Sequence, residues 1–71
     1  MAHYKKSAQD LANIASARDD GINRYVVYKH GKKYSLATVL TYRFNKGMGV
    51  DWELISCHKN GKLVPPKEVG L

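Results

Sequence analysis

Residues 24–43, RYVVYKHGKKYSLATVLTYR, carry the clearest structural signal in the sequence. This stretch is rich in the β-branched and aromatic residues that are enriched in β strands, and it is interrupted once, around Gly31. We therefore expect a β-hairpin whose strands cover residues 24–29 and 33–43. Alternation along the second strand predicts a core-facing side made of Tyr34, Leu36, Thr38, Leu40 and Tyr42.

Upstream of the hairpin, residues 7–19 have the spacing of an amphipathic helix. Ser7 is a suitable N-cap, and Asp10 follows it three residues later, as in a weak capping box. Gly21 is expected to end the helix in a left-handed conformation. Apolar residues recur at intervals of three and four, which predicts one narrow buried stripe made of Ala8, Leu11, Ala12, Ile14 and Ala15.

Two more strands are expected after the hairpin. The predicted boundaries are a loop at residues 45–49, a strand at 50–58, a type I′ turn at Asn60-Gly61 and a short strand at 62–64. Pro65 and Pro66 forbid continuation of that last strand, because proline has no N–H to donate to a sheet. The two ends of the chain, about residues 1–6 and 66–71, are expected to be flexible.

Together these elements predict an α+β fold. We expect a single small domain, residues 1–71, in which the N-terminal helix packs on a three- to four-stranded antiparallel meander. The expected core brings the helix residues Leu11 and Ile14 against Leu36, Leu40, Trp52 and Leu54 of the sheet. Val39 and Ile55 are then left on the second face, and a homodimer is an alternative way to bury them.

Length and composition exclude several classes of protein. A chain of 71 residues hides only about 60% of its unfolded surface, which leaves room for one small core. The single cysteine, Cys57, rules out an intramolecular disulfide, so a cytoplasmic protein is predicted. No apolar run approaches the roughly 18 residues of a membrane helix, so no membrane contact is predicted.

The positive charge is concentrated in one part of the chain. Twelve Lys and Arg residues stand against six Asp and Glu, which gives a net charge of +6. The charges balance in residues 1–23 and again in 50–71, so the whole excess lies in residues 24–49. Four of the five tyrosines fall in the same segment. Cations that displace counterions from phosphates, together with rings that stack on bases, are typical of nucleic-acid binding.

The predicted function is therefore non-catalytic binding of nucleic acid, DNA or RNA, through the hairpin. The residues expected to form this site are Arg24, Tyr28, Lys29, His30, Lys32, Lys33, Arg43, Lys46 and Met48. The alternative is a small regulator or inhibitor that docks on an acidic surface of a larger protein through the same basic residues. Met48, an apolar side chain between two glycines, favours that alternative.

Catalytic and metal-binding motifs are not recognised in the sequence. The histidines and Cys57 do not have the spacing of zinc ligands, so no metal or other cofactor is predicted. Cys57 and His58 are adjacent in a predicted strand and should point to opposite faces, which prevents them from acting directly as nucleophile and base. Asp51 and Glu53 share a strand face, an arrangement that is common without catalysis. We therefore do not expect an enzyme.

Overall fold

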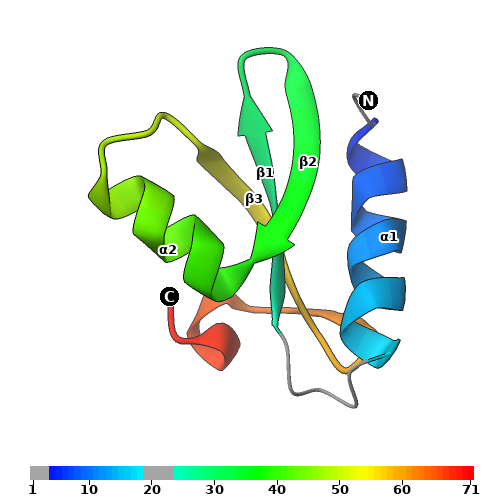
Figure 1. Ribbon diagram of the computed structural model, residues 1–71. Helices are drawn as coiled ribbons and strands as arrows, with labels where there is room; N and C mark the ends of the chain where they lie inside the picture. The colour runs from blue at the N-terminus through cyan, green and yellow to red at the C-terminus, as the bar shows by residue number, and fades with distance from the viewer. Residues whose placement is uncertain (1–3, 19–23) are drawn as a thin grey trace.

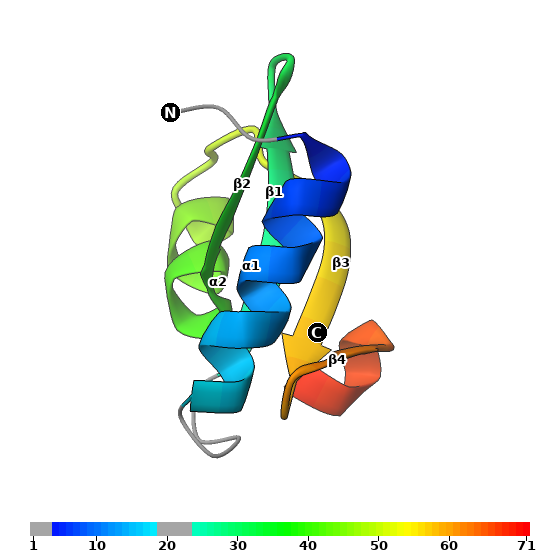
Figure 2. The same cartoon turned by 90° about the vertical axis from the view of Figure 1, so that its right-hand side faces the viewer.

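The computed structural model describes residues 4–18 and 24–71. Their elements, in chain order, are α1 (Lys5–Arg18), β1 (Tyr25–His30), β2 (Lys33–Thr38), α2 (Val39–Gly47), β3 (Glu53–Lys59), β4 (Lys62–Val64) and a 3-10 helix, η1 (Pro66–Val69). The strands form one antiparallel sheet in the order β2-β1-β3-β4. Helix α1 covers one face of this sheet, whereas α2 and η1 lie on the other (Figures 1 and 2). The predicted α+β class is confirmed.

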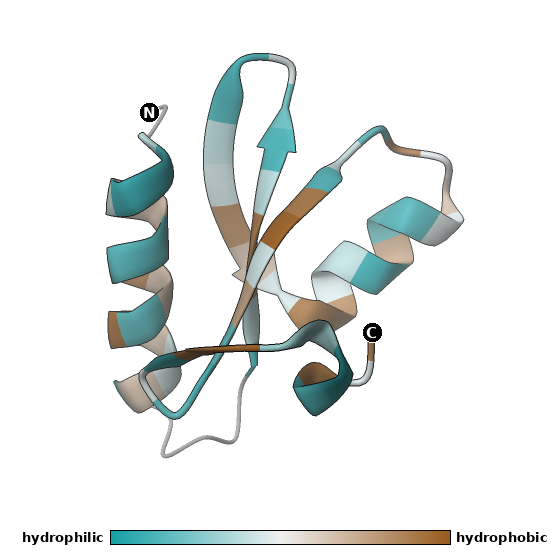
Figure 3. Cartoon of the chain, turned by 180° about the vertical axis from the view of Figure 1, so that it is seen from behind, coloured by the Kyte–Doolittle hydropathy of each residue, from teal (hydrophilic) through white to brown (hydrophobic). Residues whose placement is uncertain are grey.

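The first hairpin forms where the sequence predicts it. β1 and β2 pair in register from Tyr25 with Thr38 to His30 with Lys33. Gly31 occupies the turn with a φ of +65°, a conformation that glycine adopts without a steric penalty. Figure 1 shows this hairpin extending beyond the rest of the sheet, and Figure 3 shows that its tip is hydrophilic.

The second arm of the hairpin is shorter than predicted. A strand was expected over residues 33–43, but β2 ends at Thr38 and the chain continues as α2. The Thr38 Oγ1 accepts a hydrogen bond from the Thr41 N–H (3.2 Å) and so caps the helix. Val39 and Tyr42, three residues apart, then face the sheet together and are buried. Leu40, predicted as core, is 79% exposed instead.

Two small apolar clusters hold the layers together, one on each face of the sheet. Under α1, the alanines Ala8 and Ala12 pack on Val27. The larger helix residues Leu11 and Ile14, which were predicted to pack on the sheet, are 40% and 52% exposed. Small residues at the contact allow α1 to approach the sheet closely, which leaves its longer side chains at the margins. The opposite cluster consists of Val26, Val39, Tyr42, Cys57 and Val69, with Tyr28, Trp52, Leu54 and Val64 around it.

The C-terminal part follows the prediction as far as β4. β3 covers Glu53–Lys59 rather than residues 50–58, and β4 covers residues 62–64 as expected. Asn60 and Gly61 form the turn between them with φ values of 55° and 78°. Residues 66–71, expected to be a flexible end, include η1, in which Val69 is 2% exposed. At the other end, Lys5 and Lys6 already belong to α1, and the predicted helix stop at residues 19–21 lies outside the described residues.

A buried polar network ties α1 to β3 and to the turn before β4. The His58 ring lies 2.6 Å through Nδ1 from the Asn13 Oδ1 and 2.8 Å through Nε2 from the Ser56 Oγ. The Ser16 hydroxyl donates to the Asn13 carbonyl (3.1 Å) and accepts from the Gly61 N–H (3.0 Å). Because an amide oxygen only accepts, Nδ1 of His58 carries the proton and Nε2 accepts from the Ser56 hydroxyl.

Candidate binding surfaces

The nine residues predicted to form one site are separated into different parts of the structure. His30, Lys32 and Lys33 lie at the exposed tip of the first hairpin, with Lys29 just below them. Arg24 precedes β1, at the opposite end of that strand, about 20 Å away by the rise of an extended chain. Arg43 and Lys46 lie on α2, and Met48 follows it directly. Tyr28 lies on β1, where its ring stacks on Trp52.

The hairpin tip is less isolated from acidic residues than the sequence suggests. Lys29 is directly opposite Glu53 in the pairing of β1 with β3. Asp51 and Glu53 also border a small hollow together with Lys29 and Gly31. Lys29 therefore has acidic neighbours that come from a later part of the sequence, which reduces the positive potential beside the hairpin tip.

The rings of the basic segment are used inside the protein. Tyr28 stacks on Trp52, with ring centroids 3.8 Å apart and an interplanar angle of 13°. Tyr42 is buried beneath α2, and its centroid is 6.4 Å from that of Trp52. Tyr34 is half-buried, with the Lys29 Nζ 5.6 Å from its ring centroid. Each of these three rings therefore already has a contact within the protein, which makes it less available for stacking on a nucleic-acid base.

The outer side of α2 carries a stripe of large apolar side chains. Leu40, Phe44 and Met48 are spaced four residues apart and are 79%, 67% and 69% exposed. Residues at this spacing follow one side of a helix, and here they lie opposite the buried Val39 and Tyr42. Sequence reasoning placed Leu40 in the core and did not single out Phe44. The spacing of four between Leu40, Phe44 and Met48 was the signal that could have revealed the stripe.

Basic residues lie on α2 and next to its first turn. Arg43 and Lys46 belong to α2, and both are exposed. Exposed Arg24 adjoins the start of the helix, because its carbonyl accepts a hydrogen bond from the Val39 N–H (2.9 Å). Residues 39–50 contain no Asp or Glu. We call this surface, formed by Leu40, Phe44 and Met48 with Arg24 and Arg43 near Leu40, the α2 face. Lys46 lies four residues after the buried Tyr42 and is therefore on another side of the helix.

Ser56, His58 and Asn13 have the order of a nucleophile, a base and the group that orients the base. His58 is fully buried, and burial lowers the pKa of its ring, so that it is neutral at pH 7. The ring of His58, including the Nε2 that would have to protonate a leaving group, is fully buried, so this geometry favours a structural role. Burial also raises the pKa of the Cys57 thiol, which keeps it protonated and weakly nucleophilic.

The described residues show neither a metal-binding cluster nor a membrane span. Within residues 4–18 and 24–71, no three His, Cys, Asp or Glu side chains gather as a metal site would require. The longer described helix, α1, has 14 residues, and neither α1 nor α2 has the length and apolar character needed to cross a bilayer. No protein-family model, no curated protein sequence and no solved structure matches this chain.

Proposed function

We propose that this protein is a small non-catalytic regulator or inhibitor that docks through the α2 face on an acidic surface of a larger protein. The observation that carries the proposal is the exposed stripe of Leu40, Phe44 and Met48. Each such side chain contributes about 1.5–3 kcal/mol when it is buried against apolar atoms, so exposing all three to water is unfavourable without a partner. We place this activity in the cytoplasm, where the single cysteine would remain a thiol.

Charge decides which kind of partner fits the α2 face. Arg24 and Arg43 lie near the start of the stripe, so a partner whose apolar patch has carboxylates beside it is complementary to this surface. A second copy of the chain is a poorer fit, because it would bring like charges together across a two-fold axis and each copy carries a net +6. An apolar patch with an acidic rim on another protein is therefore the proposed target.

The test uses two labelled helical peptides of matched length. One has leucines along one side and glutamates elsewhere, and the other has lysines in place of the glutamates. We expect the acidic peptide to bind in fluorescence anisotropy with a Kd of about 10 μM, and the basic peptide at least about tenfold more weakly. Arg43→Glu should weaken binding of the acidic peptide about tenfold.

Lys62→Glu is the matched control for that charge reversal. It makes the same change in charge on β4, in an exposed residue outside the α2 face. It should change the Kd less than about twofold, because an exposed charge outside the contact surface is screened by salt. If Lys62→Glu weakens binding as much as Arg43→Glu does, the attraction is general and the α2 face is not the docking site. Concentration-dependent dimers in ultracentrifugation that disappear with Phe44→Ser would assign the face to a second copy instead.

Nucleic-acid binding remains a second candidate function, supported by the projecting hairpin tip. His30, Lys32 and Lys33 are exposed there, and a two-stranded ribbon fits the major groove of a duplex. If this function is present, labelled DNA or RNA should bind more weakly as salt is raised. Lys32→Glu combined with Lys33→Glu should reduce affinity at least about tenfold and lower the salt slope by about two.

Lys62→Glu combined with Lys67→Glu is the control for the hairpin variant, because both exposed residues lie outside the hairpin. A smaller loss of affinity in this control would locate binding at the tip. If neither single- nor double-stranded probes bind at low salt, nucleic-acid binding is excluded as a function of the hairpin tip.

A further inference from the structure

The sheet has an open edge where β3 continues beyond β4. Only Cys57, His58 and Lys59 pair with β4, although β3 begins at Glu53. Among the described elements, no strand pairs with residues 53–56 on that side. Pro65 and Pro66 follow β4 without an N–H to donate, and the chain turns away there into η1. Within residues 4–18 and 24–71, the first four positions of β3 therefore have no strand partner at this edge.

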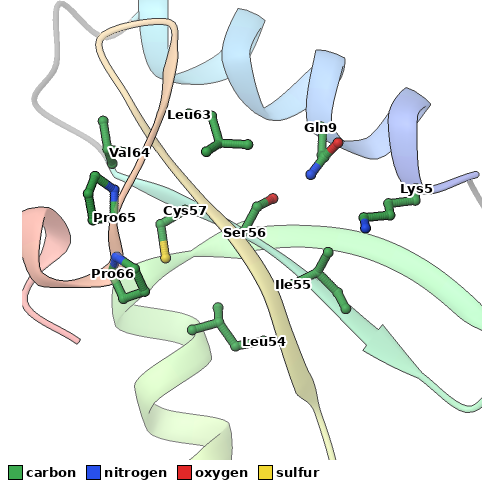
Figure 4. A pocket seen from close by; sticks show the side chains of 10 residues that line it. All are labelled: Lys5, Gln9, Leu54, Ile55, Ser56, Cys57, Leu63, Val64, Pro65 and Pro66. Carbon is green, nitrogen blue, oxygen red and sulfur yellow. The ribbon is translucent and has the colours of Figure 1, made fainter.

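A groove of about 440 Å³ lies along this edge (Figure 4). Its walls are Lys5 and Gln9 of α1, residues 54–57 of β3, and residues 63–66. Leu54 belongs to the apolar cluster under α2 and Ile55 to the one under α1, so the groove reaches both faces of the sheet. Figure 4 shows Lys5 near Ile55 at one end of the groove and the two prolines at the other.

We propose that this groove binds a short extended segment of a partner protein as an added β strand, with an acidic group of that segment at Lys5. An extended segment can satisfy the unpaired backbone groups of a sheet edge, and its alternating side chains would contact both faces, as the groove does. The described residues that line the groove include a lysine and no acidic side chain, so a carboxylate complements it.

A short segment fits this edge better than a second copy of the chain. β3 has a register shift opposite Val27 and Tyr28, where Ile55 is the extra residue. Such a bulge interrupts regular pairing and shortens the length of edge available to another long strand. The groove shares no residue with the α2 face, so this second site goes beyond the proposed function and can fail or succeed independently of it.

The experiment uses hexapeptides of alternating valine and threonine that end in glutamate or in lysine, with amidated C-termini. We expect the glutamate peptide to bind with a Kd below about 1 mM and to shift the backbone amide signals of residues 53–57 in NMR spectra. The lysine peptide should bind at least about fivefold more weakly. A glutamate peptide with N-methylated alternate amides should lose at least about tenfold in affinity, because strand addition depends on main-chain hydrogen bonds.

Lys5→Glu should reverse the preference from the glutamate to the lysine peptide. Lys6→Glu is the matched control, since Lys6 is the next residue of α1 and does not line the groove. The proposal would be overturned if Lys6→Glu weakened binding of the glutamate peptide as much as Lys5→Glu does, or if the N-methylated peptide bound equally well. It would also be overturned if the amide signals of residues 53–57 did not shift. Dimers that form through residues 53–56 would also overturn it, in favour of a second copy. Phe44→Ser should leave this binding unchanged, which separates it from docking at the α2 face.

Discussion

Replacing His58 with alanine is expected to lower the free energy of unfolding by about 3 kcal/mol, one of the largest effects of any single substitution in this chain. His58 is fully buried and bridges the Ser56 hydroxyl and the Asn13 side chain. Its loss would leave both groups without that partner and would create a cavity between α1 and the sheet. Urea denaturation at pH 7.5 measures the effect.

The matched control is His30→Ala, at the exposed tip of the first hairpin. It should change the free energy of unfolding by less than about 0.5 kcal/mol, as is usual for surface substitutions. If the two alanine variants are equally stable, the hydrogen bonds of His58 do not hold α1 against the sheet.

His58 should also make stability depend on pH. Burial lowers the pKa of His58 in the folded protein below that of the unfolded chain, so the unfolded chain takes up a proton first as the pH falls. Stability should therefore be greatest above about pH 6.5 and fall below it, by up to about 1.4 kcal/mol per pH unit, until the folded protein also becomes protonated. His58→Gln should flatten this decline between pH 7 and 5.5, whereas His30→Gln should preserve it.

Changing Leu40 and Phe44 together to serine should reduce binding of the acidic helical peptide at least about 100-fold. Both side chains are more than two-thirds exposed in the free protein, so their apolar area is available to a partner. Loss of two central apolar anchors from an interface costs about 3 kcal/mol or more, which corresponds to that ratio of dissociation constants. Anisotropy titrations of the two proteins under identical conditions give the comparison.

The double variant should fold as well as the original protein, because neither side chain belongs to the buried clusters. Its free energy of unfolding is expected to change by less than about 1 kcal/mol. Ile14→Ser provides a control for general hydrophobic attraction, since Ile14 is 52% exposed on α1 and lies outside the α2 face. Equal weakening by Ile14→Ser would contradict docking at α2.

Local signals in the sequence were sufficient to predict the two hairpins. The break at Gly31 and the Asn60-Gly61 turn predicted adjacent strands, because turn residues act over a few positions. The segment after Thr38 was harder, since its apolar residues fit both a strand and a helix. The helix is favoured because Thr38 caps it and because Val39 and Tyr42 become buried together. That burial depends on tertiary contacts, which the alternation of residues along the sequence does not reveal.

The candidate site was predictable only in part, for a related reason. The sequence identified Arg43, Lys46 and Met48, which the structure places at or directly after α2. Phe44 was missed because its exposure follows from the helix that was not predicted. The excess charge of residues 24–49 was counted along the chain, whereas folding places Glu53 beside Lys29 and separates Arg24 from the hairpin tip. Charge along a sequence therefore does not give the potential of a surface.

The set of residues that the acidic peptide contacts in solution tests most directly whether the α2 face is the docking surface. Backbone amide signals of the 15N-labelled protein should be recorded while the unlabelled acidic helical peptide is added. We expect shifts centred on residues 39–48 and Arg24, with the hairpin tip and β4 unchanged. Shifts centred on residues 29–33, or spread evenly over all basic residues, would contradict docking at the α2 face.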